Sequence, residues 1–137
     1  MLLILLAAIA SWLLHPETLG PRALRFIAPA VGLTGFGIMM WAWWQFRRSD
    51  VAICPTSATA TLITDGIYRY TRNPMYLGML LMMLALALFV GTLPFYLAAV
   101  VLFGVLNFVF CDYEEQKLSA AFGAAFRAYS GTVRRWI

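Results

Sequence analysis

Four apolar segments divide the chain, and shorter polar stretches separate them. The apolar segments cover residues 2–14, 26–46, 75–93 and 95–111. A helix needs about 20 apolar residues to cross the hydrocarbon core of a bilayer. The last three segments approach or reach that length, and we expect the shorter first segment to extend by a few residues at one end. The pattern predicts an all-α, polytopic membrane protein with four transmembrane helices in a single domain, residues 1–137.

The third and fourth apolar segments are separated by little more than the turn at residues 91–94. A connection this short permits only a tight helical hairpin. The second segment contains small residues that let helix backbones approach each other closely in lipid. These residues are Ala28, Gly32, Gly35 and Gly37. We therefore expect the second helix to pack closely against a neighbour.

The polar tail, residues 112–137, has a helical period. Apolar residues recur from the end of the fourth segment onward at spacings of three, four and seven, which is typical of one face of a helix. They are Cys111, Leu118, Phe122, Ala125 and Tyr129. The pattern predicts a C-terminal amphipathic helix. Glu115 falls on its apolar face, where a carboxylate is costly unless a cation or a hydrogen-bond donor meets it.

Basic residues are distributed unevenly between the polar segments. Of the ten Lys and Arg residues, four lie in the loop 47–74 and four in the tail 112–137. The positive-inside rule places such segments on the cytoplasmic side of the membrane. We therefore expect an integral, multi-pass protein with both termini in the cytoplasm, which in a bacterium would place it in the inner membrane.

The composition excludes a soluble domain. Hydrophobic residues make up 63% of the chain and charged residues 12%, against roughly half and a quarter in soluble domains. The two cysteines have no metal-site spacing and histidine occurs once, so we expect no metal. Cys54 lies in the predicted cytoplasmic loop, where a disulfide is not expected. The basic residues lie at the ends of apolar segments, which indicates contact with membrane lipids and no nucleic-acid partner.

The stretch GIYRYTRNPMYLG, residues 66–78, is polar and rich in aromatic rings. Asn73 as N-cap and Pro74 in the first turn form a favourable helix start. The tyrosines can form an interfacial belt, and Arg72 can anchor the stretch to lipid headgroups or to a carboxylate of the tail. Membrane anchoring explains each residue type but not their density. The tail glutamates also have a simple explanation, a solvated face on which Glu114 pairs with Lys117.

Two motifs in this order resemble the isoprenylcysteine carboxyl methyltransferase and phospholipid methyltransferase superfamily of integral membrane enzymes. They are the stretch 66–78 and, after the apolar hairpin, DYEEQKLSAAFGAAFRAYSGTVRRWI. The family pattern is roughly Gly-x-Tyr, Arg-His-Pro-x-Tyr-x-Gly, a hydrophobic hairpin, Glu-Glu and a Phe-Gly…Tyr…Val-x-Arg ending. The resemblance covers residues 58–137. It implies a methyltransferase that uses S-adenosylmethionine and acts on a lipophilic or membrane-partitioned acceptor.

The resemblance also implies a cofactor site between the loop 47–74, the start of the hairpin and the tail. By position, the residues that would border the cofactor are Ala60, Thr61, Leu62, Ile63 and Tyr68. The loop-to-helix corner beneath it would consist of Asn73, Pro74, Met75 and Tyr76. The carboxylates that would meet its polar part are those of Glu114 and Glu115. Methyl transfer depends on positioning more than on an acid–base pair, so no further catalytic residue is assigned. The oligomeric state is not indicated.

Two positions depart from the family pattern. The motif histidine is Asn73 here, which can donate a hydrogen bond but cannot act as a base near neutral pH. The isoprenylcysteine enzymes place an arginine four residues before the cofactor glutamate, where it holds the substrate carboxylate, and that position is Phe110 here. This difference argues against a prenylcysteine carboxylate as acceptor. Lipid amines and thiols, which other family members methylate, are the remaining acceptor classes.

Two other functions compete with methyl transfer. Membrane sterol reductases have a similar Arg-His-Pro-x-Tyr corner and use NADPH, but they typically have longer C-terminal segments than the tail 112–137. A small, non-catalytic membrane scaffold is the second alternative, and Asn73 is the residue that most favours it. A binding measurement with S-adenosylhomocysteine and NADPH separates the three functions.

Overall fold

The computed structural model describes residues 1–14, 17–19, 23–48 and 62–137. Over these residues the protein is helical and contains no strand, as the sequence predicts. The elements are α1 (Leu2–Leu14), α2 (Leu24–Arg48), the 3-10 helix η1 (Gly66–Arg69), α3 (Pro74–Val90), α4 (Leu93–Val105), the π-helix η2 (Leu106–Phe110), α5 (Cys111–Phe122) and α6 (Ala124–Thr132).

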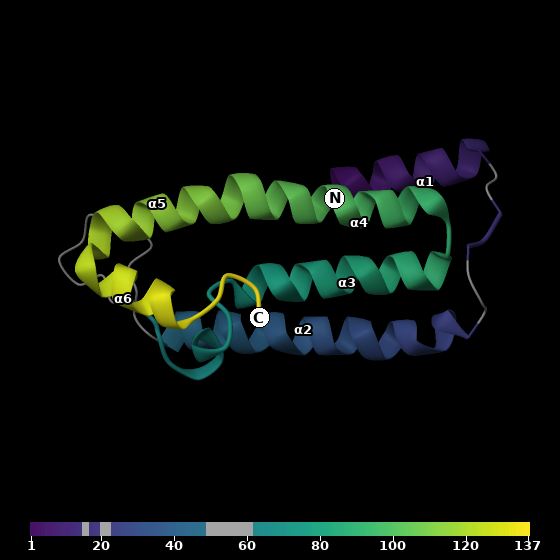
Figure 1. Cartoon of the computed structure of the whole chain (residues 1–137). Helices are drawn as coiled ribbons and strands as arrows, with labels where there is room; N and C mark the ends of the chain where they lie inside the picture. The colour runs from purple at the N-terminus through teal and green to yellow at the C-terminus, as the bar shows by residue number, and fades with distance from the viewer. Residues whose placement is uncertain (15–16, 20–22, 49–61) are drawn as a thin grey trace.

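The long helices lie side by side, and one of them is a continuous helix with α1 along the outer side of its α4 part (Figure 1). It joins α4, η2 and α5 and runs from Leu93 to Phe122 over 30 residues. This helix and α2, with 25 residues, are long and apolar enough to cross a membrane by themselves. The apolar helices α1 and α3 are shorter, with 13 and 17 residues. Among the described residues, two helices therefore meet the length expected of a span.

The first apolar segment forms α1 with the predicted bounds. The expected extension does not occur at its N-terminal end, because the helix begins at Leu2. Residues 15–16, at the other end, lie outside the described residues. The N-terminus lies beside the middle of the continuous helix in Figure 1. At about 1.5 Å per residue, α1 is about 20 Å long, so it is shorter than the hydrocarbon core.

The hairpin between α3 and α4 is confirmed. Gly91 ends α3 in the left-handed region, with a φ of 75°, and its N–H donates to the carbonyl of Ala87 at 2.8 Å. Thr92 then precedes α4, and Pro94 lies in the first turn of that helix. A left-handed glycine after the last turn and a proline at the start of the next helix are the usual residues for these positions. Ser11 of α1 shares a hydrogen bond of 2.8 Å with Thr92.

Small residues bring α2 and α3 into direct backbone contact. A Cβ atom added to Gly35 would lie 2.8 Å from the carbonyl oxygen of Gly78, and one added to Gly78 would lie 2.6 Å from that of Gly35. A Cβ on Gly32 would meet the Cβ of Ala85 at 3.3 Å. Gly37 has no such neighbour within 4 Å. The predicted close approach is therefore confirmed for Gly32 and Gly35, and Gly37 does not take part in it.

The tail does not form a single amphipathic helix. Gly123, with a φ of 49°, separates α5 from α6, and α6 folds back from the end of α5 (Figure 1). Beyond the break, Phe126 and Tyr129 are buried and Ala125 is exposed. A helical period holds only within one continuous helix. One continuous apolar face across residues 111–129 is therefore wrong: beyond Gly123, Tyr129 is buried as predicted, but Ala125 is exposed.

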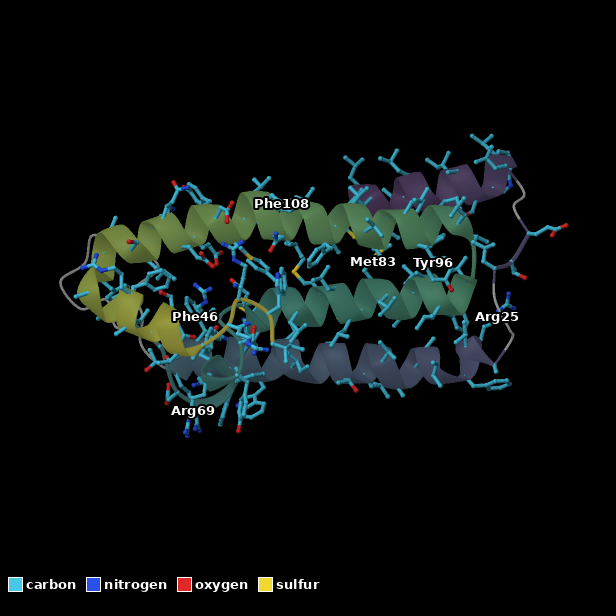
Figure 2. All side chains as sticks on the ribbon, viewed as in Figure 1. Arg25, Phe46, Arg69, Met83, Tyr96 and Phe108 are labelled. Carbon is cyan, nitrogen blue, oxygen red and sulfur yellow. The ribbon has the colours of Figure 1, made fainter. Side chains whose placement is uncertain are left out.

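Large apolar side chains cover the outside of the helical bundle. Phe26, Leu33, Val100 and Phe108 are all at least two-thirds exposed, and Figure 2 shows Phe108 on the outer side of the continuous helix. A soluble protein rarely exposes apolar surface on this scale. This surface is suited to contact with lipid chains.

Candidate functional site

The polar residues gather at one end of the bundle. The end of α2, η1, the start of α3, α5 and α6 meet there, and the hairpin turn lies at the opposite end (Figure 1). Figure 2 shows Arg69 and Arg25 at these opposite ends. The basic residues of the tail and of the described part of the loop 47–74 therefore share one end, as the charge distribution predicts.

Gln45, near the end of α2, holds η1 in place. Its Nε2 donates to the backbone carbonyl of Asp65 at 2.8 Å and to the Asp65 carboxylate at 3.1 Å. Its Oε1 accepts a hydrogen bond of 3.2 Å from the N–H of Ile67. The glutamine therefore joins the described end of the loop to the end of a long helix.

Residues 71–74 form the corner between η1 and α3. Pro74 is the first residue of α3 and Asn73 occupies the N-cap position, as predicted. The Asn73 side chain makes no capping bond. Instead, its Nδ2 donates to the carbonyl of Arg135 at 3.2 Å. Thr71 Oγ1 donates to the same carbonyl at 3.1 Å and accepts from the N–H of Asn73 at 3.2 Å. The position of Asn73 is as predicted, but its partner lies 62 residues away.

Two arginines meet Glu115. Arg135 donates to both of its carboxylate oxygens at 2.8 Å, from Nε and Nη2. Arg72 Nη1 lies 3.2 Å from Oε1 of the same carboxylate. The prediction that this glutamate needs a cationic partner is confirmed, and the anchor of Arg72 is a tail carboxylate. Bidentate arginine–carboxylate pairs are among the stronger charge-assisted contacts.

Glu114 has different surroundings. The Tyr76 hydroxyl donates a short hydrogen bond to its carboxylate, which is otherwise exposed. The expected partner Lys117 lies instead over the Tyr113 ring, with Nζ 4.4 Å from its centroid. In the described part of the chain, the carboxylates with ion-pair partners are Asp112 and Glu115. Two adjacent glutamates therefore differ: Glu115 pairs with two arginines, while Glu114 accepts from Tyr76 and has no ion-pair partner among the described residues.

Tyr68 and Tyr129 join η1 to α6. The Tyr129 hydroxyl donates to the carbonyl of Tyr68 at 2.7 Å. Burial raises the pKa of Tyr68 to about 12, with smaller contributions from Tyr129 and from the negative charge of Glu114. Burial also raises the pKa of Tyr129 to about 12, although Arg72 acts in the opposite direction. Both phenols therefore keep their protons well above neutral pH and can donate hydrogen bonds.

The structure brings most of the predicted site residues to one end of the molecule. Pro74 is buried and Met75 is partly buried at the start of α3. Leu62 and Ile63 are partly buried in the described segment that leads into η1. Ala60 and Thr61 lie outside the described residues. The roles of all these residues toward a cofactor stay predictions.

Arg72 also has an unpartnered donor. Its Nε is buried and has no hydrogen-bond partner among the described residues, although Nη1 contacts Glu115. A buried donor without an acceptor is costly and uncommon in folded proteins. The corner therefore has one N–H donor without an acceptor, Arg72 Nε, and at Glu114 an exposed carboxylate without an ion-pair partner among the described residues.

Asn107 and Arg135 belong to this cluster but were not predicted as site residues. Asn107 is a polar residue inside the fourth apolar segment, and such residues are usually paired and functional. Arg135 occupies the last position of the Val-x-Arg ending. These two signals could have indicated the residues, but nothing in the sequence indicates that they contact each other.

Two other features do not compete with this site. An apolar crevice of about 410 Å³ lies between α2 and α3, lined by residues that include Ala28, Phe36 and Phe89. It has no charged side chain, so it is unsuited to a polar cofactor. Across the described ranges, no group of three or more His, Cys, Asp or Glu residues is arranged to hold a metal ion.

A family model for phospholipid methyltransferases matches residues 24–125, which is more than half of the chain. The chain belongs to the phospholipid methyltransferase family. The match confirms the resemblance to the wider superfamily that includes the isoprenylcysteine carboxyl methyltransferases. It also begins earlier than the motifs do, because it includes α2. No curated protein and no solved structure matches the chain.

Membership of this family indicates a membrane methyltransferase. The matched region contains the corner, the hairpin, Glu114 and Glu115, and it ends within α6. Arg135 lies beyond the match, although its contacts reach back into it.

Proposed function

We propose that the protein transfers a methyl group from S-adenosylmethionine to a lipophilic or membrane-partitioned acceptor. The observation that carries this proposal is a pair of polar groups at the corner. Glu114 is exposed, accepts from Tyr76 and has no ion-pair partner among the described residues, and Arg72 has a buried Nε–H without an acceptor there. Family members generally use this cofactor, which carries an ammonium, a sulfonium, ribose hydroxyls and a carboxylate.

The residues present fit such a cofactor. Glu114 can accept hydrogen bonds from an ammonium or from hydroxyls, and Arg72 Nε can donate to a carboxylate. The rings of Tyr68 and Tyr76 can lie against the adenine or near the sulfonium through a cation–π contact. The cofactor, when bound, supplies the activated methyl group. The residues Ala60 to Ile63 and Asn73 to Tyr76 would complete its surroundings.

The contribution of the protein to the reaction is to position the reactants and to exclude water. An in-line displacement needs the nucleophile and the methyl carbon about 3 Å apart in a dry pocket. The corner lies at the polar end of long apolar helices, so a lipid-soluble acceptor and a water-soluble cofactor can meet there. In this arrangement the start of α3, with Pro74 and Tyr76, would lie where the two environments meet.

The charges at the corner favour an amine or a thiol acceptor. Both arginines of the cluster, Arg72 and Arg135, are already paired with carboxylates. Phe110, at the position where the carboxyl methyltransferases have an arginine, is exposed and touches Tyr76 edge-on at 6.2 Å between ring centroids. A carboxylate acceptor would gain no cation from Phe110. A lipid amine or a thiol needs none.

We further propose that four helices cross the membrane and that both termini are cytoplasmic. The hairpin links α3 to the continuous helix, and α3 packs along α2. Reporter fusions at residue 137 and at Thr92 are expected to report opposite sides of the membrane. A third fusion at residue 1 tests whether the short α1 crosses. Finding residue 137 and Thr92 on the same side would exclude this topology.

Calorimetry in detergent tests the function directly. The purified protein is expected to bind S-adenosylhomocysteine and not NADPH. Binding of NADPH alone would indicate a reductase, and binding of neither would indicate a non-catalytic scaffold. An assay with labelled cofactor and a panel of prenylcysteine, phosphatidylethanolamine and thiol acceptors then identifies the acceptor class.

A further inference from the structure

The last five residues, 133–137, form a strap that lies between the corner and α5. They are not helical, and Figure 1 shows them running back from α6 to the start of α3. This C-terminal strap lies outside the family match. Its contacts nevertheless reach the segments that hold Glu114 and Tyr76.

The side chain of Arg135 binds α5 and η2. Besides its two bonds to Glu115, it donates to Asp112 Oδ1 at 2.8 Å. Its Nη1 donates to the backbone carbonyl of Asn107 at 3.1 Å and lies 3.4 Å from the Asn107 side-chain oxygen. These carboxylates raise the pKa of Arg135 above its usual value, with the Glu115 hydrogen bonds contributing most. The arginine therefore stays charged in this position.

The contact with Arg135 falls in the π-helix η2. A π-helical turn interrupts the regular bonding of an α-helix, and such turns are frequent at functional sites. Asn107 lies in η2, and its backbone carbonyl accepts from Arg135. The side-chain oxygen of Asn107 also accepts from Trp136 Nε1 at 2.9 Å. Two consecutive residues of the strap therefore dock on one residue of η2.

The backbone of the strap binds the corner. The carbonyl of Arg135 accepts from Thr71 and Asn73, and the carbonyl of Arg134 accepts from the N–H of Arg72 at 3.1 Å. One residue, Arg135, thus joins the corner to α5. The corner holds Tyr76 and α5 holds Glu114.

We propose that Arg135 is a positioning residue that sets the relation between the corner and Glu114. It acts through Glu115, the neighbour of Glu114, and through Thr71 and Asn73, which precede Tyr76. It does not need to touch the cofactor or the acceptor. This inference rests on the proposed function, and part of its test is independent of any ligand.

The test compares Arg135→Met with Arg134→Met. Methionine keeps most of the side-chain length and removes the charge and the donors. Arg134 is the matched control, because its side chain is exposed and has one described hydrogen bond, of 3.5 Å, within the strap. Hydrogen exchange of the amides at residues 70–73 is measured first, without ligand. S-adenosylhomocysteine affinity is measured next by calorimetry, followed by kcat and KM for the cofactor.

In Arg135→Met, the corner amides are expected to exchange roughly tenfold faster, while amides of the hairpin helices keep their wild-type rates. The affinity for S-adenosylhomocysteine is expected to fall at least roughly tenfold, because binding must then also order the corner. Arg134→Met is expected to stay within about twofold of wild type in both measurements. Arg135→Lys, which keeps the charge without the bidentate fork, is expected to lie in between.

Each other outcome has a defined meaning. If the corner amides of Arg135→Met exchange at wild-type rates, the inference is overturned. If they do so while the affinity for S-adenosylhomocysteine is lost, the arginine contacts the ligand directly, and the inference is overturned as well. Faster exchange with wild-type affinity shows that the strap does not serve the site. If the wild-type protein binds no S-adenosylhomocysteine, the proposed function fails, and the exchange data alone then decide whether Arg135 orders the corner.

Discussion

The α2–α3 interface and the junction between the corner and α5 are built in opposite ways. In the first, Gly35 and Gly78 let two backbones touch. In the second, no such approach joins the elements, and side chains with the C-terminal strap connect them instead. Tight packing makes the first interface stable, and the crevice beside it is lined by apolar side chains that suit no polar ligand. The second leaves polar groups available at the corner, at the cost of depending on a few specific contacts.

This difference explains why ligand-binding chemistry is expected at one end only. Gly35 and Gly78 lie within their helices, where backbone N–H and carbonyl groups bond along the helix, so their contact adds no polar group for a ligand. At the corner, by contrast, the exposed Glu114 carboxylate has no ion-pair partner among the described residues, and Arg72 Nε has no acceptor there. The small residues let α2 and α3 pack closely, and the charged residues provide the polar groups of the candidate site.

The largest expected effect comes from blocking the close approach between α2 and α3. Gly35→Leu is expected to destabilise the protein by about 3 kcal/mol, the upper end of the usual range for overpacking. A Cβ there would meet Leu81 Cβ at 2.7 Å and the Gly78 carbonyl at 2.8 Å, and neither the backbone nor a Cβ can move aside easily. Thermal unfolding in detergent measures the loss.

Gly37→Leu is the matched control for this substitution. A Cβ at position 37 meets no atom within 4 Å, so the same change is expected to be neutral or slightly stabilising, because glycine is a weak helix former. Equal destabilisation at both positions would contradict the assignment of Gly35 to the interface.

A smaller effect is expected from Glu114→Gln, which tests the junction. If the carboxylate binds a cationic or hydroxyl group of the cofactor, affinity for S-adenosylhomocysteine falls by about 1.5–3 kcal/mol, or roughly ten- to hundredfold. Thermal stability is expected to change little. The matched change Glu115→Gln is expected to lower thermal stability, because it weakens the pairing of Arg135 and Arg72. Wild-type affinity in a folded Glu114→Gln sample would leave this glutamate without a binding role.

The smallest effect is expected from Asn73→His, which restores the family residue. An imidazole N–H can replace the amide donor to the Arg135 carbonyl, so methyl transfer is expected to stay within about threefold of wild type or to rise, since one neutral hydrogen bond is exchanged for another. Asn73→Asp is the contrasting substitution. An ionised carboxylate at this position would repel the Arg135 carbonyl, so this variant is expected to have lower activity than Asn73→His. A folded, cofactor-binding but inactive Asn73→His would show that this corner is adapted to asparagine.

The sequence alone determined the elements that depend on local properties. The apolar segment 2–14 predicts α1 with its observed bounds, and Gly91 with Pro94 predicts the hairpin, because burial in lipid and backbone conformation are properties of short stretches. The charge distribution also predicted that the tail and the corner share one end. The position of Asn73 at the start of α3 follows from its neighbour Pro74 for the same reason.

The tertiary structure decided which residues meet. The break at Gly123 redirected α6 and ended the predicted apolar face, although glycine alone does not determine whether a helix continues. Glu114 and Glu115 are chemically identical neighbours, so only the placement of Arg135, 20 residues further on, determined which one is neutralised. Such pairing depends on where distant backbone segments lie in space, and the periodicity of a single segment holds no information about that.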